Sequence, residues 1–169
     1  GFYCLIGDPV KQSVSEISHN AVMRKLGIDA VYAKIVVPPH DLQTFVKYAK
    51  DIDIKGFSVT IPLKERILDF LDVIDLEAEQ IGAVNTVVNR EGQLVGYNTD
   101  GKGALRAIEN LTTLAEKRVV LIGAGGAAKA LAFTFHAAGA SVVVLNRTTS
   151  RAHALASHVG CQSGSLEDL

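Results

Sequence analysis

The first hundred residues alternate short apolar runs with stretches of helical periodicity. Three of the runs, at residues 2–6, 31–37 and 56–60, have the length and composition of buried strands. Alternating strands and helices are typical of an α/β layer structure, in which helices cover a mainly parallel sheet. We therefore predict an α/β fold with a mainly parallel sheet for this part of the chain.

The segments between these strands carry helical patterns. After Asp41, apolar residues recur at positions i, i+3, i+4 and i+7, which predicts a helix with one apolar face made of Leu42, Phe45, Val46 and Ala49. Pro62 suits the first turn of another helix, whose buried stripe would be Ile67, Leu68 and Leu71. Residues 83–89 and 93–97 flank a short turn that contains glycine, and this pattern predicts a β-hairpin.

A second pattern, typical of a βαβ unit, begins at Arg118. Its predicted elements are, in order, a strand at 118–122, a glycine-rich turn at 123–128, an alanine-rich helix to about residue 138, a strand at 141–145, a polar corner at 146–150 and a helix at 151–159. A helix at about 100–114 joins the two patterns. We expect two α/β domains, residues 1–102 and 103–169.

Composition and charge narrow the possible functions. With 48% hydrophobic and 21% charged residues among 169, and a mean hydropathy of +0.23, the chain is typical of folded globular proteins. The net charge of −1 gives no overall field that attracts nucleic acid or anionic lipid. The longest apolar runs are too short and too interrupted by glycine to span a bilayer. We therefore expect neither nucleic acid nor a membrane among its partners.

The positions of the cysteines and histidines indicate the cellular compartment of the protein and whether it binds a metal. Cys4 and Cys161 lie far apart and form no CxxC motif, and the first residues lack the features of a signal peptide. This pattern favours reduced thiols and a cytoplasmic setting. The five histidines show no HExxH or Cys/His ligand spacing, so we expect no metal site.

The glycine-rich turn has the form Gly123-x-Gly125-x-x-Ala128, a variant of the dinucleotide-binding motif. Such glycines let the backbone approach a pyrophosphate, and the following helix N-terminus offers unpaired N–H groups and a partial positive charge. The alternative is a structural strand-to-helix turn without a ligand. The flanking strand and helix favour a dinucleotide site, and its candidate residues are Gly123, Ala124, Gly125, Gly126 and Ala127.

The end of the second strand of this unit bears on the choice of cofactor. NAD-binding forms of the fold carry an acid here that holds the ribose 2′-hydroxyl, whereas this chain has Asn146, Arg147 and Thr148. A guanidinium suits a 2′-phosphate, and Arg151 lies one helical turn further on. We predict NADP rather than NAD. The alternative for Arg147 is a solvated loop arginine.

Polar residues at the ends of elements in the first domain are candidates for a substrate site, each with a structural alternative. Ser13 and Ser15 equally suit the N-terminus of a helix. Thr60 and Lys64 follow a buried strand. The helix dipole opposes a lysine in the first turn of a helix, so Lys64 is either solvated or retained for chemistry.

Asn85 and Asp100 are the remaining candidates. Asn85 lies in an apolar run, where a polar side chain needs a partner or a ligand, and Asp100 suits a helix N-cap as well as a catalytic carboxylate. With the residues above, they complete a series of motifs that resembles the shikimate dehydrogenase family. The matching residues are Gly7-Asp8-Pro9-Val10 with Ser13, Ser15, His19 and Asn20; Val59-Thr60-Ile61-Pro62-Leu63-Lys64; Gly82-Ala83-Val84-Asn85-Thr86; Tyr97-Asn98-Thr99-Asp100-Gly101; Gly123-Ala124-Gly125-Gly126-Ala127; and Asn146-Arg147-Thr148.

The resemblance implies an NADP-dependent oxidoreductase that reversibly reduces 3-dehydroshikimate to shikimate, a step in aromatic amino acid biosynthesis. Its first domain would bind the substrate, and its second would be a Rossmann NADP-binding domain. Lys64 and Asp100 match the family's catalytic pair, in which the aspartate orients the lysine. The implied substrate-binding residues are Ser13 and Ser15 for the carboxylate, with Thr60 nearby, Asn85 for the ring hydroxyls, and Lys64 and Asp100.

The chain departs from the family pattern in three places. Glu16 replaces the proline usual after the second serine, and Lys11-Gln12 precedes the first serine where a histidine is more usual. The chain also ends at Leu169, after only the first half of a cofactor domain, so we expect it to be part of a longer protein. Fusion to a dehydroquinate dehydratase domain is one possible form. The alternatives in function are a quinate/shikimate dehydrogenase of broader specificity and a catalytically silent relative that binds a metabolite.

Overall fold

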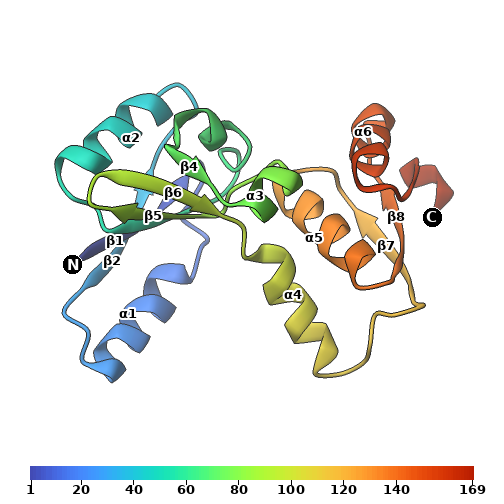
Figure 1. The fold of residues 1–169 in the computed structure, drawn as a ribbon, viewed down its shortest axis with the longest axis horizontal. Coiled ribbons are helices and arrows are strands. Elements are labelled where there is room, and N and C mark those ends of the chain that lie inside the picture. Colours follow the sequence, from blue (N-terminus) through green and yellow to red (C-terminus); the bar gives the residue numbers. More distant parts are fainter. The chain divides into compact units, whose positions relative to one another are not determined.

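The computed structural model describes residues 1–169, which form two compact units, Gly1–Asn98 and Thr99–Leu169 (Figure 1). Both units are α/β, as predicted, and each has a hydrophobic core of its own. The expected division after residue 102 falls inside a helix, α4, which spans Asp100–Glu109.

The first unit is built on a six-stranded sheet. Its strands are β1 (Phe2–Gly7), β2 (Val31–Val36), β3 (Gly56–Val59), β4 (Val73–Ile74), β5 (Thr86–Arg90) and β6 (Gln93–Tyr97). They lie in the order β2-β1-β3-β5-β6-β4. β1 pairs in parallel with β2 and β3, and β4 pairs in parallel with β6, whereas both pairings of β5 are antiparallel. The predicted strands and the hairpin are confirmed.

Helices cover both faces of this sheet. In Figure 1, α2 (Leu42–Asp51) lies above the sheet and α1 (Ser15–Leu26) lies below it, and α3 (Leu76–Ile81) follows β4. The predicted apolar face of α2 is confirmed, because Leu42, Val46 and Ala49 are buried and Phe45 packs against the same core. By contrast, α1 has no buried residue. It is attached to the sheet by polar contacts and by Met23, which packs against the small cluster of Leu5, Val10 and Tyr32.

The helix predicted to begin at Pro62 is shorter and begins later. Residues 61–65 form turns, in which the Leu63 N–H donates to the Thr60 carbonyl (2.9 Å), and a 3₁₀ helix, η1, spans only Arg66–Phe70. The chain is still turning away from β3 at Pro62, so this proline lies in a turn and not in a first helical turn. The predicted apolar stripe still faces the core: Ile67 is buried in it, and Leu68 and Leu71 pack against it.

The second unit has a three-stranded parallel sheet in the order β7-β8-β9. Its elements are α4, β7 (Arg118–Ile122), α5 (Gly126–Ala137), β8 (Ser141–Leu145), α6 (Thr149–Val159), β9 (Gln162–Gly164) and a 3₁₀ helix, η2 (Leu166–Asp168). The predicted βαβ unit is confirmed. α5 begins inside the glycine-rich turn, and α4 ends before residue 114 because the N–H groups of Leu111 and Thr112 both bond to the Ile108 carbonyl.

α4 and α5 pack closely at Gly101. This glycine is buried in the first turn of α4, and a Cβ added to it would overlap Thr134 Oγ1 and lie 2.7 Å from the Ala130 carbonyl oxygen, both on α5. Only glycine permits so close an approach. Gly103, two residues further along α4, is exposed and has no atom within 4 Å of an added Cβ. The contact at Gly101 therefore sets the position of α4 against α5.

Candidate functional site

The predicted polar residues of the first unit gather at one edge of its sheet. Ser13 and Ser15 follow β1, Thr60 and Lys64 follow β3, and Asn85 directly precedes β5. Because β1 and β3 are parallel and β5 is antiparallel to β3, these positions lie at the same edge. Ligands of α/β sheets bind at the carboxyl ends of strands. We therefore take this edge as the candidate substrate site.

Backbone hydrogen bonds join the segments at this edge. The Val59 N–H donates to the Asn85 carbonyl (2.8 Å), and the Asn85 N–H donates to the Tyr97 carbonyl (3.0 Å). The Val84 N–H donates to the Lys64 carbonyl (2.8 Å), which ties the turn after β3 to the segment before β5. The backbones of Lys64 and Asn85, which lie far apart in the sequence, are therefore held in one network.

Two predictions about these residues were wrong in detail. Lys64 lies in the turn before η1 and not in the first turn of a helix, so no helix dipole opposes its charge there. Asn85 lies in a bend before β5 rather than within the strand, and its Oδ1 accepts a hydrogen bond from the Thr86 hydroxyl (2.8 Å). Both residues are partly exposed, which leaves them accessible to a ligand at this edge.

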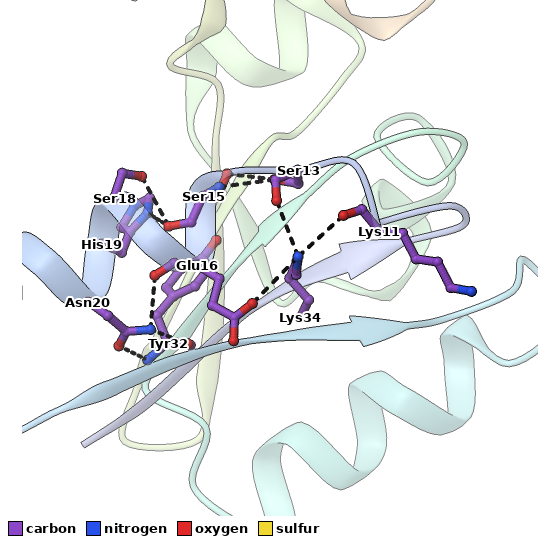
Figure 2. Close-up of polar contacts among 9 residues, drawn as sticks. All are labelled: Lys11, Ser13, Ser15, Glu16, Ser18, His19, Asn20, Tyr32 and Lys34. Atoms are coloured by element: carbon purple, nitrogen blue, oxygen red, sulfur yellow. Dashed lines mark hydrogen bonds and ion pairs between the residues drawn. The ribbon is translucent and has the colours of Figure 1, made fainter.

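Ser13 and Ser15 form a hydroxyl pair where α1 begins. Ser13 Oγ donates to Ser15 Oγ (3.0 Å) and accepts from the Ser15 N–H (3.2 Å), as Figure 2 shows. α1 begins at Ser15 and its N-cap residue is Val14, with no hydrogen bond from a capping side chain. Neither serine is therefore the N-cap of this helix. The pair offers neutral donors of the kind that bind a carboxylate.

Glu16, which departs from the family pattern, points toward Lys34 of β2. Glu16 Oε2 and Lys34 Nζ are 3.5 Å apart, and the same ammonium donates to the carbonyls of Ser13 (3.2 Å) and Lys11 (3.3 Å). The negative charge beside the serines is thus compensated from the neighbouring strand. Lys34 was not among the residues predicted from the sequence. The available signal was a single charged residue within the strand Val31–Val36.

Asn20 and His19 attach α1 to β2. Asn20 Nδ2 donates to the carbonyls of Tyr32 (2.7 Å) and Glu16 (2.9 Å), and its Oδ1 accepts from the Tyr32 N–H (2.9 Å). The His19 ring stacks on the Tyr32 ring with centroids 4.2 Å apart. Burial of the phenol raises the pKa of Tyr32. These contacts place the first turn of α1, and hence Ser15, beside β2 (Figure 2).

Asp100 belongs to the second unit, where it is the first residue of α4. The N-cap residue of that helix is Thr99, so Asp100 does not take the capping position that the sequence left open. A carboxylate in the first turn of a helix is stabilised by the helix dipole. The preceding Asn98 is buried, and its amide donates to the Ala83 carbonyl (2.8 Å), which fixes the chain just before Asp100.

The glycine-rich turn leaves room for a ligand at the start of α5. Gly123 has φ +116°, a conformation that favours glycine, and its N–H donates to the Leu145 carbonyl (2.7 Å). An added Cβ at Gly123 or Gly125 would meet no atom within 4 Å, so the space beside both residues is open. No side chain caps α5. The residues present therefore fit the pyrophosphate of a dinucleotide.

The corner after β8 carries the residues predicted to select the cofactor. Asn146 Nδ2 donates to the Thr148 carbonyl (2.9 Å), which shapes the corner, and Arg147 is exposed. Thr148 is the N-cap residue of α6. Arg151 lies in the first turn of the same helix and is exposed. Two guanidinium groups therefore flank a corner that contains no carboxylate.

Residues 1–169 contain no group of three or more His, Cys, Asp or Glu side chains that could hold a metal ion. None of the helices is long and apolar enough to cross a membrane. Both cysteines are free thiols. Burial raises the pKa of Cys4 to about 12 and also raises the pKa of Cys161, so both thiols are held in the protonated form at neutral pH.

Two family models match the two units of the chain. The model for the shikimate dehydrogenase substrate binding domain matches residues 5–87, and the model for shikimate / quinate 5-dehydrogenase matches residues 105–169. The chain belongs to the shikimate dehydrogenase family. The two matches fall on either side of the division between the two units.

Other members of the shikimate dehydrogenase family resemble the chain over nearly its whole length. The shikimate dehydrogenase (NADP(+)) of Pyrococcus furiosus is 47% identical over 99% of the chain. A shikimate dehydrogenase whose crystal structure was solved in complex with NADP+ has 39% sequence identity to the chain, and its fold matches 98% of the chain with a TM-score of 0.94. The enzyme from Thermus thermophilus, in complex with NADP(H) and shikimate, is 38% identical, with a TM-score of 0.91 over 99% of the chain.

The chain spans about 60% of the length of these relatives: 60% of the Pyrococcus protein, 61% of the NADP+ complex and 64% of the Thermus enzyme. Two further relatives carry other names. The shikimate biosynthesis protein AroDE of Chlamydia pneumoniae is 42% identical over 91% of the chain, which corresponds to 32% of that protein. A quinate dehydrogenase from Corynebacterium glutamicum in complex with NAD is 32% identical, with a TM-score of 0.85.

Proposed function

We propose that this chain carries the substrate site and part of the cofactor site of an NADP-dependent shikimate dehydrogenase, which reversibly reduces 3-dehydroshikimate to shikimate. The observation that carries the proposal is the joining of the Lys64 and Asn85 segments at the sheet edge that also carries the Ser13–Ser15 pair. One edge thereby offers donors for a carboxylate, for ring hydroxyls and for a carbonyl oxygen. Membership of the family supports the same function.

Lys64 is the proposed catalytic acid. Reduction of a carbonyl places negative charge on its oxygen, so an ammonium that donates a hydrogen bond and then a proton lowers the barrier. The partly exposed position of Lys64 allows this contact. For Asp100 we propose the role of the partner carboxylate that the family resemblance implies. In the reverse direction, Lys64 would accept the proton from the hydroxyl of shikimate.

Hydrogen bonds to the carboxylate and hydroxyls of the substrate would orient its ring in the site. The hydroxyls of Ser13 and Ser15 would donate to the carboxylate after their mutual contact opens. Asn85 would bond the ring hydroxyls, with Thr60 nearby at the end of β3. The bonds to the ring hydroxyls are neutral and contribute roughly 0.5–1.5 kcal/mol each, whereas the bonds to the charged carboxylate contribute about 1.5–3 kcal/mol each.

The cofactor would be held at the start of α5 and at the corner after β8. Backbone N–H groups at Gly123–Ala127 would bind the pyrophosphate, and Arg147 would bind the 2′-phosphate with help from Asn146, Thr148 and Arg151. When bound, the nicotinamide donates or accepts the hydride. The open space at Gly123 and Gly125 supports this assignment.

A steady-state assay on the longest natural form of the chain tests the proposal. We expect oxidation of shikimate with NADP, and a kcat lowered roughly 100- to 10,000-fold in Lys64→Ala with little change in KM. Lys47→Ala, at an exposed position on α2, is the matched control and should retain the wild-type kcat. Higher kcat/KM with quinate and NAD would favour the broader dehydrogenase, whereas shikimate binding without turnover would favour a silent relative.

A further inference from the structure

Lys34 is the only charged residue of β2, and its ammonium is held by the loop that carries the serine pair. Three oxygens lie within 3.5 Å of Nζ: the carbonyls of Lys11 and Ser13 and the carboxylate of Glu16. An ammonium has three donors, so this set can use all of them. About a quarter of the Lys34 side chain is exposed, so most of it is covered by the fold.

The contacts to Lys34 also determine which way the loop faces. In Figure 2 the ammonium lies on the β2 side of the loop, where the carbonyls of Lys11 and Ser13 turn toward it. The contact between the hydroxyls of Ser13 and Ser15 runs along the loop itself, between the two residues. The Ser13 N–H donates to the Val10 carbonyl (3.1 Å), which closes the loop from within. The two carbonyl oxygens are thus turned toward Lys34 and bonded to it, so they are not left to repel an anion beside the hydroxyls.

Glu16 adds a negative charge beside the serine pair. It directly follows Ser15, so an uncompensated carboxylate here would oppose the binding of an anion by the two hydroxyls. Like charges at short range oppose each other even where water screens them. The 3.5 Å contact with Lys34 offsets that repulsion and holds the Glu16 side chain toward β2.

We infer that Lys34 is a positioning residue for recognition of the substrate's carboxylate. It holds the Lys11–Ser13 carbonyls and the Glu16 side chain toward β2, so that the hydroxyls of Ser13 and Ser15 meet the carboxylate without a competing negative charge. This inference rests on the proposed function. It predicts an effect on binding of the carboxylate and not on the chemical step, because Lys34 does not touch the reacting atoms.

The test compares shikimate with its methyl ester, which lacks the negative charge, in the longest natural form of the chain. We expect Lys34→Met to raise the KM for shikimate about three- to thirtyfold and to leave kcat within about twofold, while the KM for the ester changes by less than about twofold. Lys34→Arg, which keeps the charge and the donors, should stay within about threefold of wild type. Lys47→Met is the matched control on α2 and should not change either KM.

A second pair of variants separates charge from loop geometry. Lys34→Gln keeps a donor but leaves Glu16 uncompensated, so the KM for shikimate should rise, and adding Glu16→Gln should lower it again. This pair also serves if Lys34→Met fails to fold, as judged from circular dichroism and Tm. An unchanged KM in the Lys34 variants, equal losses for acid and ester, or no recovery in the double variant would overturn the inference. If the wild type does not oxidise shikimate, the proposed function itself fails, which is a distinct result.

Discussion

Replacing Gly101 by alanine tests the close packing of α4 on α5. The added Cβ would overlap Thr134 Oγ1 and lie 2.7 Å from the Ala130 carbonyl oxygen, well inside the 3.4 Å at which ordinary contacts begin. The Thr134 side chain has little freedom because it is buried, and the carbonyl belongs to the backbone of α5. Overpacking of this kind typically costs about 1–3 kcal/mol, whereas alanine returns up to about 1 kcal/mol in helix preference. We expect Gly101→Ala to lower the free energy of unfolding by roughly 1–2 kcal/mol.

Gly103→Ala is the matched control in the same helix. An added Cβ there meets nothing within 4 Å, so the same substitution should raise the free energy of unfolding by roughly 0.5–1 kcal/mol. Urea unfolding and Tm measure both effects, and 1 kcal/mol corresponds to about 2–4 °C in proteins of about 150–250 residues. The reasoning is refuted if Gly101→Ala is as stable as the wild type while Gly103→Ala shows its expected gain.

Two further predictions concern the cofactor and pH. Arg147→Ala should reduce the preference for NADP over NAD roughly ten- to a hundredfold, because it removes charge-assisted bonds to the 2′-phosphate. The ratio of kcat/KM for the two cofactors measures this preference, and Arg106→Ala, at an exposed position on α4, is the control that should leave the ratio unchanged. Hydrogen bonds from Lys50 and the Leu94 N–H lower the pKa of Asp72, so its stabilisation is present at neutral pH and is lost as pH falls through that lowered pKa. Asp72→Asn should therefore lower the free energy of unfolding by about 0.5–1 kcal/mol at pH 7, a modest value because the Lys50–Asp72 pair is partly exposed. Urea unfolding of both proteins across pH checks this, and a difference between them that persists into strong acid would contradict it.

The elements that could be predicted are those with a strong local pattern. β7 and β8 are apolar runs bounded by polar residues and glycine, and both have the predicted bounds. The four apolar positions of α2 recur at helical spacing, and the structure packs them against the core as expected. Two short strands lacked such a signal: β4 has only two residues, and β9 reads Gln162–Gly164, which is polar. Their pairing depends on neighbouring strands rather than on their own sequence.

The residues of the candidate site could be chosen from the sequence, but the bonds that connect their segments could not. Ser13, Lys64 and Asn85 could be chosen because polar residues at the ends of apolar strands are conspicuous. The bond from Val84 to the Lys64 carbonyl joins segments far apart in the chain, and no local pattern reports it. Lys34 was missed for the same reason, since the carbonyls that it contacts lie more than twenty residues earlier. Propensity and periodicity describe near neighbours, whereas such contacts depend on the complete topology.

The open glycine turn at the start of α5 has a consequence for evolution. Its candidate contacts with a dinucleotide come from backbone N–H groups, which every amino acid except proline possesses. A larger side chain in this turn can block the binding of a dinucleotide, but it cannot change which groups of the dinucleotide the backbone contacts. The corner after β8 is different, because Asn146, Arg147 and Thr148 present side chains that a single base change can replace. Selection can therefore alter which dinucleotide is preferred while the attachment of its pyrophosphate stays the same.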